Sequence, residues 1–253
     1  MSASAIESAL EGIAAWRVFD ANVRVGKSGV HGELALEAPE LLKEMDRFGI
    51  ARALASHFAA EEYDALEGNC ALARIANARL VPVWAALPDR ESIQKLAAYK
   101  PKAARLSFGV SQHNFSPAPW CSGELFEFLQ AHSVLTLVAL EQIGWSALAE
   151  TLENFPRLPL LLLEPGYRAD RYLFPLLEKF QNLYFDTSTY LAHRQLEAFV
   201  EHLGPERAVF GSRLPLYTPA AALFVLATAR ISEAAKRAIS GENLNQLVEA
   251  ARP

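Results

Sequence analysis

The sequence predicts a single (β/α)8 barrel, an α/β fold of the TIM type. Short aliphatic runs alternate along the chain with longer segments whose apolar residues recur every three to four positions, which is the pattern of parallel strands joined by helices. The number of such runs comes close to eight. With 253 residues, the chain is long enough for one full barrel and short for two enzyme-sized domains.

The predicted strands are short and rich in aliphatic residues, and several are apolar without interruption. The stretch LPLLLLE suits a strand that is buried on both faces, between the barrel interior and the helix layer. In chain order, the predicted strands cover residues 16–19, 52–56, 80–85, 103–107, 134–140, 158–163, 183–185 and 208–210.

The segments between these strands have the spacing of amphipathic helices. In the first, Leu41, Met45 and Phe48 share one face. The predicted helices cover residues 39–48, 62–77, 91–99, 124–132, 146–154, 172–180, 195–203 and 219–228, and a last helix over 232–239 and a turn through Leu247 would close the barrel. One domain is expected over residues 1–253, with residues 1–15 as an N-terminal helical extension.

The longest stretch without a predicted element, residues 109–123, follows the fourth strand. In a barrel it would lie over the carboxyl ends of the strands, where active sites are built. It is either an ordinary surface loop or a lid whose His113, Phe115 and Trp120 face a ligand. A doubly wound open sheet is the competing architecture, but neither a GxGxxG nor a GxxxxGKS/T motif follows the first strand.

Composition argues against several classes of function. The formal net charge is -5, whereas binding to nucleic-acid phosphates needs a clustered excess of Lys and Arg. No apolar run reaches the ~18 residues that span a bilayer, and the N-terminus lacks the basic and apolar segments of a signal peptide, so we expect a cytoplasmic protein without membrane contacts. Cys70 and Cys121 have no CxxC spacing and indicate neither a disulfide framework nor a thiolate zinc site.

Four stretches carry a resemblance to a known family. They are VFDANVRVG at the first strand, LLKEMDRFGIARAL into the second, LPLLLLEPG at the sixth, and the run from NLYFDTS through LGPERAVFGSRLPLYTP to ISGENLNQL. They resemble the amidohydrolase-related family, in the branch that includes small decarboxylases and lactonases acting on cyclic or aromatic carboxylates. The likeness spans nearly the whole chain, and it implies the barrel fold, a small anionic carboxylate as ligand and a homodimer.

The differences from the family pattern fall at the positions that bind the metal in the family. The family's first strand ends in a His-x-His pair, for which this chain has Asn22 and Arg24. The histidines expected after the fifth and sixth strands fall near Ala139 and at Glu164, and the aspartate of the family's GSD motif is Arg213. Because a guanidinium stays protonated and offers only donors, these arginines would repel a cation. We therefore expect neither a metal nor another cofactor.

Residues at the carboxyl ends of barrel strands point into one mouth, and the charges there lead to two hypotheses. In the first, Arg24 and Arg213 pair with Glu164 and with Asp20 or Asp186, because buried charges must be paired. The chain would then be a pseudoenzyme that serves as a partner subunit, scaffold or regulator.

The second hypothesis is a metal-independent hydrolase, lactonase or lyase for a small carboxylate-bearing substrate. Arginines can stand in for a metal, since stabilising a developing oxyanion requires only fixed positive charge near it. The residues expected to bind substrate are Arg24, Arg105, Arg213, Asn22, His113 and Tyr167, and the candidate acids or bases are Glu164, Asp20 and His57. A histidine that caps the second strand is an equally good interpretation of His57.

The pairing of the arginines distinguishes these hypotheses. Fully paired arginines favour the pseudoenzyme, and an open pocket with unpaired arginines favours the enzyme. A third class, a ligand-binding sensor, would share the open pocket and show no turnover. A nucleophilic serine hydrolase is disfavoured because the sequence has no GxSxG elbow.

Overall fold

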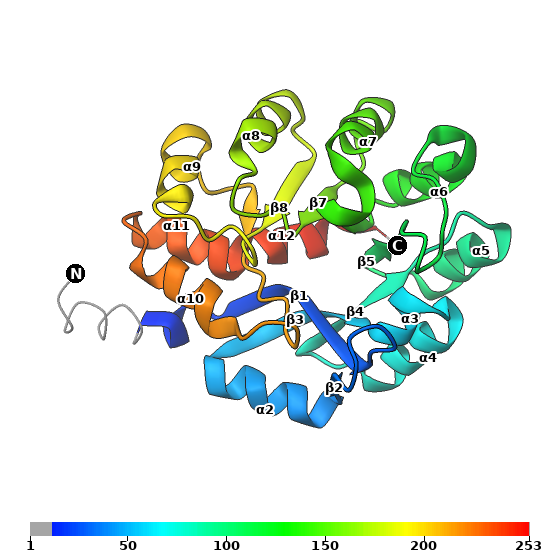
Figure 1. Cartoon of the computed structure of the whole chain (residues 1–253), viewed down its shortest axis with the longest axis horizontal. Coiled ribbons are helices and arrows are strands. Elements are labelled where there is room, and N and C mark those ends of the chain that lie inside the picture. Colours follow the sequence, from blue (N-terminus) through cyan, green and yellow to red (C-terminus); the bar gives the residue numbers. More distant parts are fainter. Residues whose placement is uncertain (1–11, 253) are drawn as a thin grey trace.

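A nine-stranded sheet forms the centre of the protein in a computed structural model that describes residues 12–252 (Figure 1). The strands are β1 (Val18–Lys27), β2 (Ala35–Leu36), β3 (Ile50–His57), β4 (Leu80–Ala85), β5 (Ala103–Leu106), β6 (Leu135–Ala139), β7 (Leu160–Leu163), β8 (Leu183–Asp186) and β9 (Ala208–Val209). Their order is β2-β1-β3-β4-β5-β6-β7-β8-β9, with β2 antiparallel to β1 and the other neighbours parallel.

The eight parallel strands close into the predicted (β/α)8 barrel. The Ala21 backbone N–H donates to the Phe210 carbonyl at 2.9 Å, and the Arg24 N–H donates to the Leu214 carbonyl at 2.8 Å. These bonds join β1 to the chain that follows β9. The carboxyl ends of all eight parallel strands therefore face the same end of the barrel.

Helices surround the barrel, most of them on its outside (Figure 1). They are η1 (Gly12–Trp16), α2 (Ala38–Phe48), α3 (Phe58–Glu62), α4 (Ala65–Ile75), α5 (Arg90–Tyr99), α6 (Pro119–Ala131), α7 (Leu140–Asn154), α8 (Asp170–Lys179), α9 (Gln195–Leu203), α10 (Pro219–Thr228), α11 (Glu233–Arg237), η2 (Ala238–Glu242) and α12 (Asn243–Ala250). Of the predicted N-terminal extension, residues 1–11 lie outside the described residues. No helix between residues 12 and 252 is long and apolar enough to cross a membrane.

The apolar strands divide their side chains between two cores. In β7, Leu161 and Leu163 belong to the cluster inside the barrel, whereas Leu160 and Leu162 pack with the helix layer. This confirms the expectation that LPLLLLE is buried on both faces. Leu244 of α12 joins the inner cluster, so the last helix packs against the barrel interior.

Several elements differ from the sequence-based prediction: α6 begins at Pro119 and α7 at Leu140, both before the predicted starts at residues 124 and 146. Two other differences affect the site. β1 continues to Lys27, well past the predicted end at residue 19, and its register shifts between Asp20 and Val23. Its polar residues interrupt the apolar run but remain buried, because they bond one another in the barrel mouth. The predicted helix 62–77 is two helices, α3 and α4, since the Asp64 side chain accepts the Glu67 N–H at 2.9 Å and begins a new helix.

Gly68 allows α4 to lie against α3, and a methyl group there should be costly. A Cβ at Gly68 would lie 2.3 Å from the Ala60 backbone nitrogen. We expect Gly68→Ala to lower the free energy of unfolding by about 1–3 kcal/mol, measured by urea denaturation. The control is Gly123→Ala in α6, where a Cβ meets nothing within 4 Å and should stabilise by up to about 1 kcal/mol. Equal stability of the two variants would contradict this packing.

Candidate functional site

The barrel mouth collects a buried cluster of charged and amide side chains. Arg24 and Asn22 lie on β1 and Arg105 on β5, whereas Glu164 directly follows β7 and Arg213 lies in the segment after β9. The side chains of Arg24 and Arg105 are only 7% and 4% exposed. Charges this deeply buried require partners, and the structure provides them through two glutamates.

Glu61 of α3 joins two of the arginines. Its Oε2 lies 3.0 Å from the Nε of Arg24 and 3.2 Å from the Nε of Arg105. The contact with Arg24 is a hydrogen bond as well as an ion pair. One carboxylate therefore holds two guanidinium groups that would otherwise repel each other across the mouth.

Glu164 makes the second bridge. Its Oε1 accepts a hydrogen bond from Nη2 of Arg24 at 3.2 Å, and its Oε2 lies 2.8 Å from Nε of Arg213. The Arg213 contact is an ion pair whose angle is not that of a hydrogen bond. With a side chain that is 21% exposed, Arg213 is also the most accessible of the three arginines.

Asn22 lies at the centre of the cluster and uses both ends of its amide. Its Nδ2 donates to Oε1 of Glu164 at 3.1 Å and to Oδ2 of Asp186 at 3.0 Å. Its Oδ1 accepts from Nη1 of Arg24 at 3.2 Å and from Nη1 of Arg105 at 3.3 Å. The amide thus connects the cations to the acids without adding charge.

The backbone holds two of these residues in an uncommon conformation. Glu164 has φ 58° and Arg213 has φ 62°, in the left-handed region that side chains other than glycine rarely adopt. The Glu164 N–H donates to Oδ1 of Asp186 at 2.8 Å, which helps to fix this turn. Such positions persist only where the surroundings determine them, and they are common at functional sites.

The pairing shifts the pKa values of the cluster. Burial alone would lower the pKa of Arg24, but the negative charges of Glu61 and Glu164 raise it above its ordinary value. Burial would raise the pKa of Glu164, but the three arginines hold it below its usual range. Burial, together with the charge of Arg24, lowers the pKa of Arg105 to about 10. All three groups stay charged at neutral pH.

Two buried aspartates, Asp20 and Asp186, have raised pKa values. Burial raises the pKa of Asp20 to about 7, although donors from Ser212 and Asn22 oppose the shift. Burial and the charge of Glu164 raise the pKa of Asp186 to about 6. Asp20 Oδ1 accepts the backbone N–H groups of Asn22 and Ser212, both at 3.0 Å, whereas its Oδ2 has no partner in the described part of the chain.

The raised pKa of Asp20 predicts a pH-dependent stability. The folded protein holds this proton more tightly than the unfolded chain, so the stabilisation is fully present below pH ~4 and is lost as the pH rises through ~7. Between pH 5 and 8 the wild type should lose about 3 kcal/mol more than Asp20→Asn, which resembles the protonated acid. Urea denaturation at both pH values tests this, and parallel profiles would contradict it.

A cavity of about 170 Å³ lies over the cluster. Its wall contains Arg24, Arg105 and Arg213 and four glutamates, Glu61, Glu62, Glu141 and Glu164. Glu62 in turn accepts from the Ser28 hydroxyl at 2.7 Å and from the Gly29 N–H at 2.6 Å, which holds the chain after β1 over the mouth. The acids therefore balance the arginines around this space.

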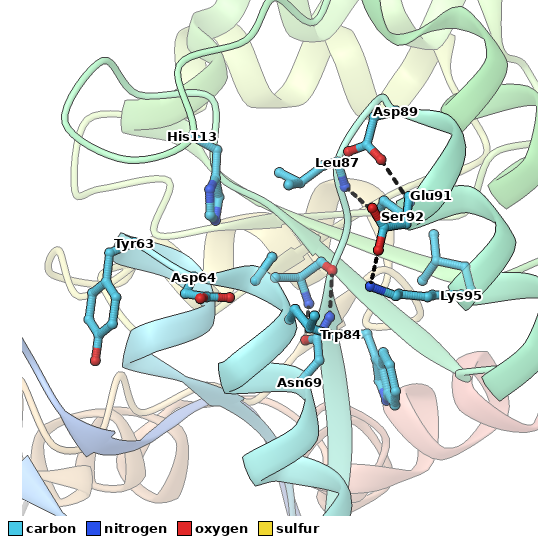
Figure 2. A pocket seen from close by; sticks show the side chains of 14 residues that line it. Tyr63, Asp64, Asn69, Trp84, Leu87, Asp89, Glu91, Ser92, Lys95 and His113 are labelled. Atoms are coloured by element: carbon cyan, nitrogen blue, oxygen red, sulfur yellow. Dashed lines mark hydrogen bonds and ion pairs between the residues drawn. The ribbon is translucent and has the colours of Figure 1, made fainter.

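Five predicted site residues do not line this cavity. Asp20 and Asn22 are buried in the network described above, and the other three lie elsewhere. His57 accepts the Ala59 N–H through Nδ1, and burial lowers its pKa, which is the capping arrangement. Tyr167 is 60% exposed and lines a neighbouring cavity. His113 points into a third cavity, of about 300 Å³, between α4 and α5 (Figure 2), and its Nε2 lies 2.7 Å from the Ala60 carbonyl. Their predicted roles remain predictions.

The predicted partners of the arginines need one correction. Glu164 pairs with Arg24 and Arg213, but neither Asp20 nor Asp186 bonds an arginine, because their oxygens accept backbone N–H groups and the Asn22 amide instead. The missing partner is Glu61. The sequence does hold a sign of this partner, the acidic pair Glu61–Glu62 in HFAAEE shortly after a strand. It was missed because the helix was predicted to begin only at residue 62.

The residues of the mouth do not fit a divalent metal. Ala139 ends β6, Glu164 directly follows β7 and Arg213 lies in the segment after β9, while β1 presents Asn22 and Arg24. Guanidinium and amide N–H groups cannot ligate a cation, and here they occupy the carboxylate oxygens of Glu61 and Glu164. Within residues 12–252, no group of three or more His, Cys, Asp or Glu side chains is arranged to hold a metal.

Comparison with known protein families identifies the family of this chain. The family profile described as amidohydrolase matches residues 33–244. The chain belongs to the amidohydrolase family. The matched region begins after β1, so the correspondence of Asn22 and Arg24 to the family's His-x-His pair depends on their place on the first barrel strand. No curated protein matches the chain.

Several solved structures share the fold of this chain. A TIM-barrel protein from Bordetella bronchiseptica has a TM-score of 0.74 at 14% identity, covering 92% of this chain and 98% of that one. A manganese-bound 5-carboxyvanillate decarboxylase from Novosphingobium aromaticivorans gives 0.75 at 11%, covering 94% and 98%. The putative 2-pyrone-4,6-dicarboxylic acid hydrolase from Pseudomonas putida gives 0.70 at 14%, covering 92% and 97%. At these identities the likeness concerns the fold alone.

Proposed function

We propose that this amidohydrolase-family protein is a catalytically degenerate member, a pseudoenzyme in which a salt-bridged cluster has replaced the metal centre. The observation that carries the proposal is the continuous chain of contacts Arg105–Glu61–Arg24–Glu164–Arg213 across the strand ends. Each arginine has a carboxylate partner. Such a protein would act through its partners, as a subunit, scaffold or regulator.

The charge balance of the mouth supports this proposal over anion binding. Four glutamates and three arginines line the cavity, so the wall carries no formal excess of positive charge. A carboxylate ligand would have to displace a glutamate from a buried arginine, and breaking a buried pair costs about 3–5 kcal/mol. The volume of about 170 Å³ also falls below the roughly 300–1,000 Å³ of typical ligand pockets.

One observation favours the second function, a metal-independent hydrolase, lactonase or lyase for a small carboxylate. Arg213 is only partly buried and lies at the cavity wall, with a single ion pair to Glu164. It is the guanidinium that could turn towards a substrate anion. Glu164, Asp20 and His57 remain the candidate acids or bases for that function, with Arg24, Arg105, Asn22, His113 and Tyr167 as candidate binding residues.

Turnover assays distinguish the two functions. The substrates are 2,6-dihydroxybenzoate, 5-carboxyvanillate and 2-pyrone-4,6-dicarboxylate, on which relatives of this fold are named as acting. We expect no product above the buffer control, with or without added zinc or manganese. Saturable turnover that Arg213→Gln abolishes would overturn the pseudoenzyme proposal and establish the alternative.

Three further expectations remain predictions. They are a single domain over residues 1–253, a homodimer and a cytoplasmic location. Size-exclusion chromatography with light scattering tests the homodimer, and a monomer at micromolar concentration would contradict it.

A further inference from the structure

The exposed apolar side chains lie mainly at one end of the barrel, where the parallel strands finish. Eleven large apolar side chains within residues 12–252 are exposed, and nine of them lie in a segment that follows a strand or in the first turn of the next helix. These nine are Val30, Tyr63, Leu66, Val110, Trp120, Tyr167, Tyr172, Leu191 and Tyr217. We call this surface the mouth face, because the mouth cavity lies at the same end.

The segment after β5 is the most apolar part of the mouth face. Val110 is 85% exposed, and Trp120, in the first turn of α6, is 82% exposed. Residues 107–119 contain no Asp, Glu, Lys or Arg. A single exposed apolar residue is ordinary, but several on one face mark an interaction surface, and an exposed tryptophan is a typical anchor of such a surface.

One side of the mouth face is acidic. The segments after β3 and β4 expose four carboxylates and a single arginine, Arg90. The carboxylates belong to Asp64, Glu67, Asp89 and Glu91. We call this part of the face the acidic sector.

Another side of the mouth face is basic. The exposed charged residues that follow β7 and β8, up to the start of α9, are Arg168, Arg171 and Arg194. Asp170 lies among them but is only partly exposed, and it accepts the Tyr190 hydroxyl at 2.6 Å. We call this part of the face the arginine sector.

The two sectors lie opposite each other across the barrel. The eight parallel strands follow one another around the ring in the order β1, β3, β4, β5, β6, β7, β8 and β9. In this ring β7 is four places from β3, and β8 is four places from β4, which is half of the way round. Figure 1 accordingly shows α3 and α4 on the opposite side of the ring from α8 and α9.

We propose that a second copy of this chain covers the mouth face in a two-fold symmetric dimer. The axis lies in the plane of the face and runs from between β5 and β6 to between β9 and β1. Rotation about it lays the acidic sector of each copy over the arginine sector of the other, so the symmetry forms two complementary contacts at once. The uncharged segment after β5 then lies beside its counterpart, where Trp120 contacts the second copy.

This dimer supplies a partner for the proposed pseudoenzyme, and it rests on that function, because a copy over the mouth would exclude substrate. The two claims can fail separately. A monomeric wild type that shows no turnover of the small carboxylates would overturn only the dimer. A monomeric wild type with turnover would overturn the pseudoenzyme as well.

Sedimentation velocity of the full chain tests the dimer. We expect a dimer with a Kd below ~20 μM in ~50 mM salt and at least ~10-fold weaker association in ~500 mM salt, which screens exposed charges. Trp120→Ser should weaken association by at least ~10-fold, because it removes an apolar anchor from both copies. A wild type that is monomeric under these conditions would overturn the proposal.

Two charge-reversal variants test which sectors meet. Arg168→Glu with Arg171→Glu makes both sectors of one variant negative, and Glu67→Lys with Glu91→Lys makes both sectors of the other positive. Each variant alone should be monomeric because like charges would face each other, and an equimolar mixture should form a heterodimer. A mixture that stays monomeric would overturn this arrangement.

The control places the same change of charge at the other end of the barrel. Lys102→Glu with Arg157→Glu alters exposed residues that precede β5 and β7, and this variant should dimerise as the wild type does. Circular dichroism establishes that each variant is folded. Dimers in all three variants, or a monomer in the control variant, would mean that the copies meet through another face.

Discussion

Replacing Glu61 by glutamine should lower the free energy of unfolding by about 3–5 kcal/mol, the cost of leaving buried charges without a counter-ion. Glutamine keeps the shape of the side chain and removes only its charge. Arg24 and Arg105 would then face each other in a dry mouth, with side chains 7% and 4% exposed. Urea denaturation at neutral pH measures the effect.

Two further variants show that the effect of Glu61→Gln comes from buried pairing. Glu153→Gln breaks an ion pair with Lys179 in which both side chains are more than half exposed, and it should cost about 0–1 kcal/mol. Adding Arg105→Gln to Glu61→Gln should recover part of the lost stability, since one unpaired cation is removed with its partner. A loss below ~1 kcal/mol in Glu61→Gln alone would mean that the two guanidinium groups do not depend on Glu61.

Restoring the family's ligands should create a zinc site. The variant combines Asn22→His, Arg24→His, Ala139→His, Glu164→His and Arg213→Asp; these positions lie on β1, at the end of β6, directly after β7 and in the segment after β9. Removing two guanidinium groups and adding imidazoles and a carboxylate supplies the donors that zinc requires. We expect a zinc Kd below ~1 μM, measured by competition with a chromophoric chelator.

The control for the zinc variant keeps one arginine. A four-substitution protein that retains Arg24 carries the other new ligands but leaves a fixed positive charge beside them, and it should bind zinc at least ~100-fold more weakly. Circular dichroism establishes whether each variant is folded. A folded five-substitution variant without zinc affinity would contradict the correspondence between these positions and the family's ligands.

Much of the fold could be predicted from the sequence because apolar spacing determines it. The strand over residues 80–85 and the helices over 195–203 and 219–228 have the predicted bounds. The second half of β1 was missed because Asn22 and Arg24 are polar at positions that are buried. Their burial depends on partners from β5, α3 and the turn after β7, which local patterns do not reveal.

Most residues of the site could be predicted from the sequence, but which of them form ion pairs with one another could not. Family resemblance places Arg24, Glu164 and Arg213 at strand ends, and the structure brings them together. Glu61 was missed because α3 is a separate short helix whose acidic residues turn into the mouth. Which carboxylate meets which guanidinium depends on side-chain geometry across segments far apart in sequence.

The most direct test of the replaced metal centre is elemental analysis of the wild-type protein purified from cells supplied with zinc and manganese. We expect less than ~0.1 metal ion per chain, because arginines and an asparagine occupy positions of the family's ligands. One equivalent of bound metal, retained after dialysis and lost together with stability on chelation, would contradict it.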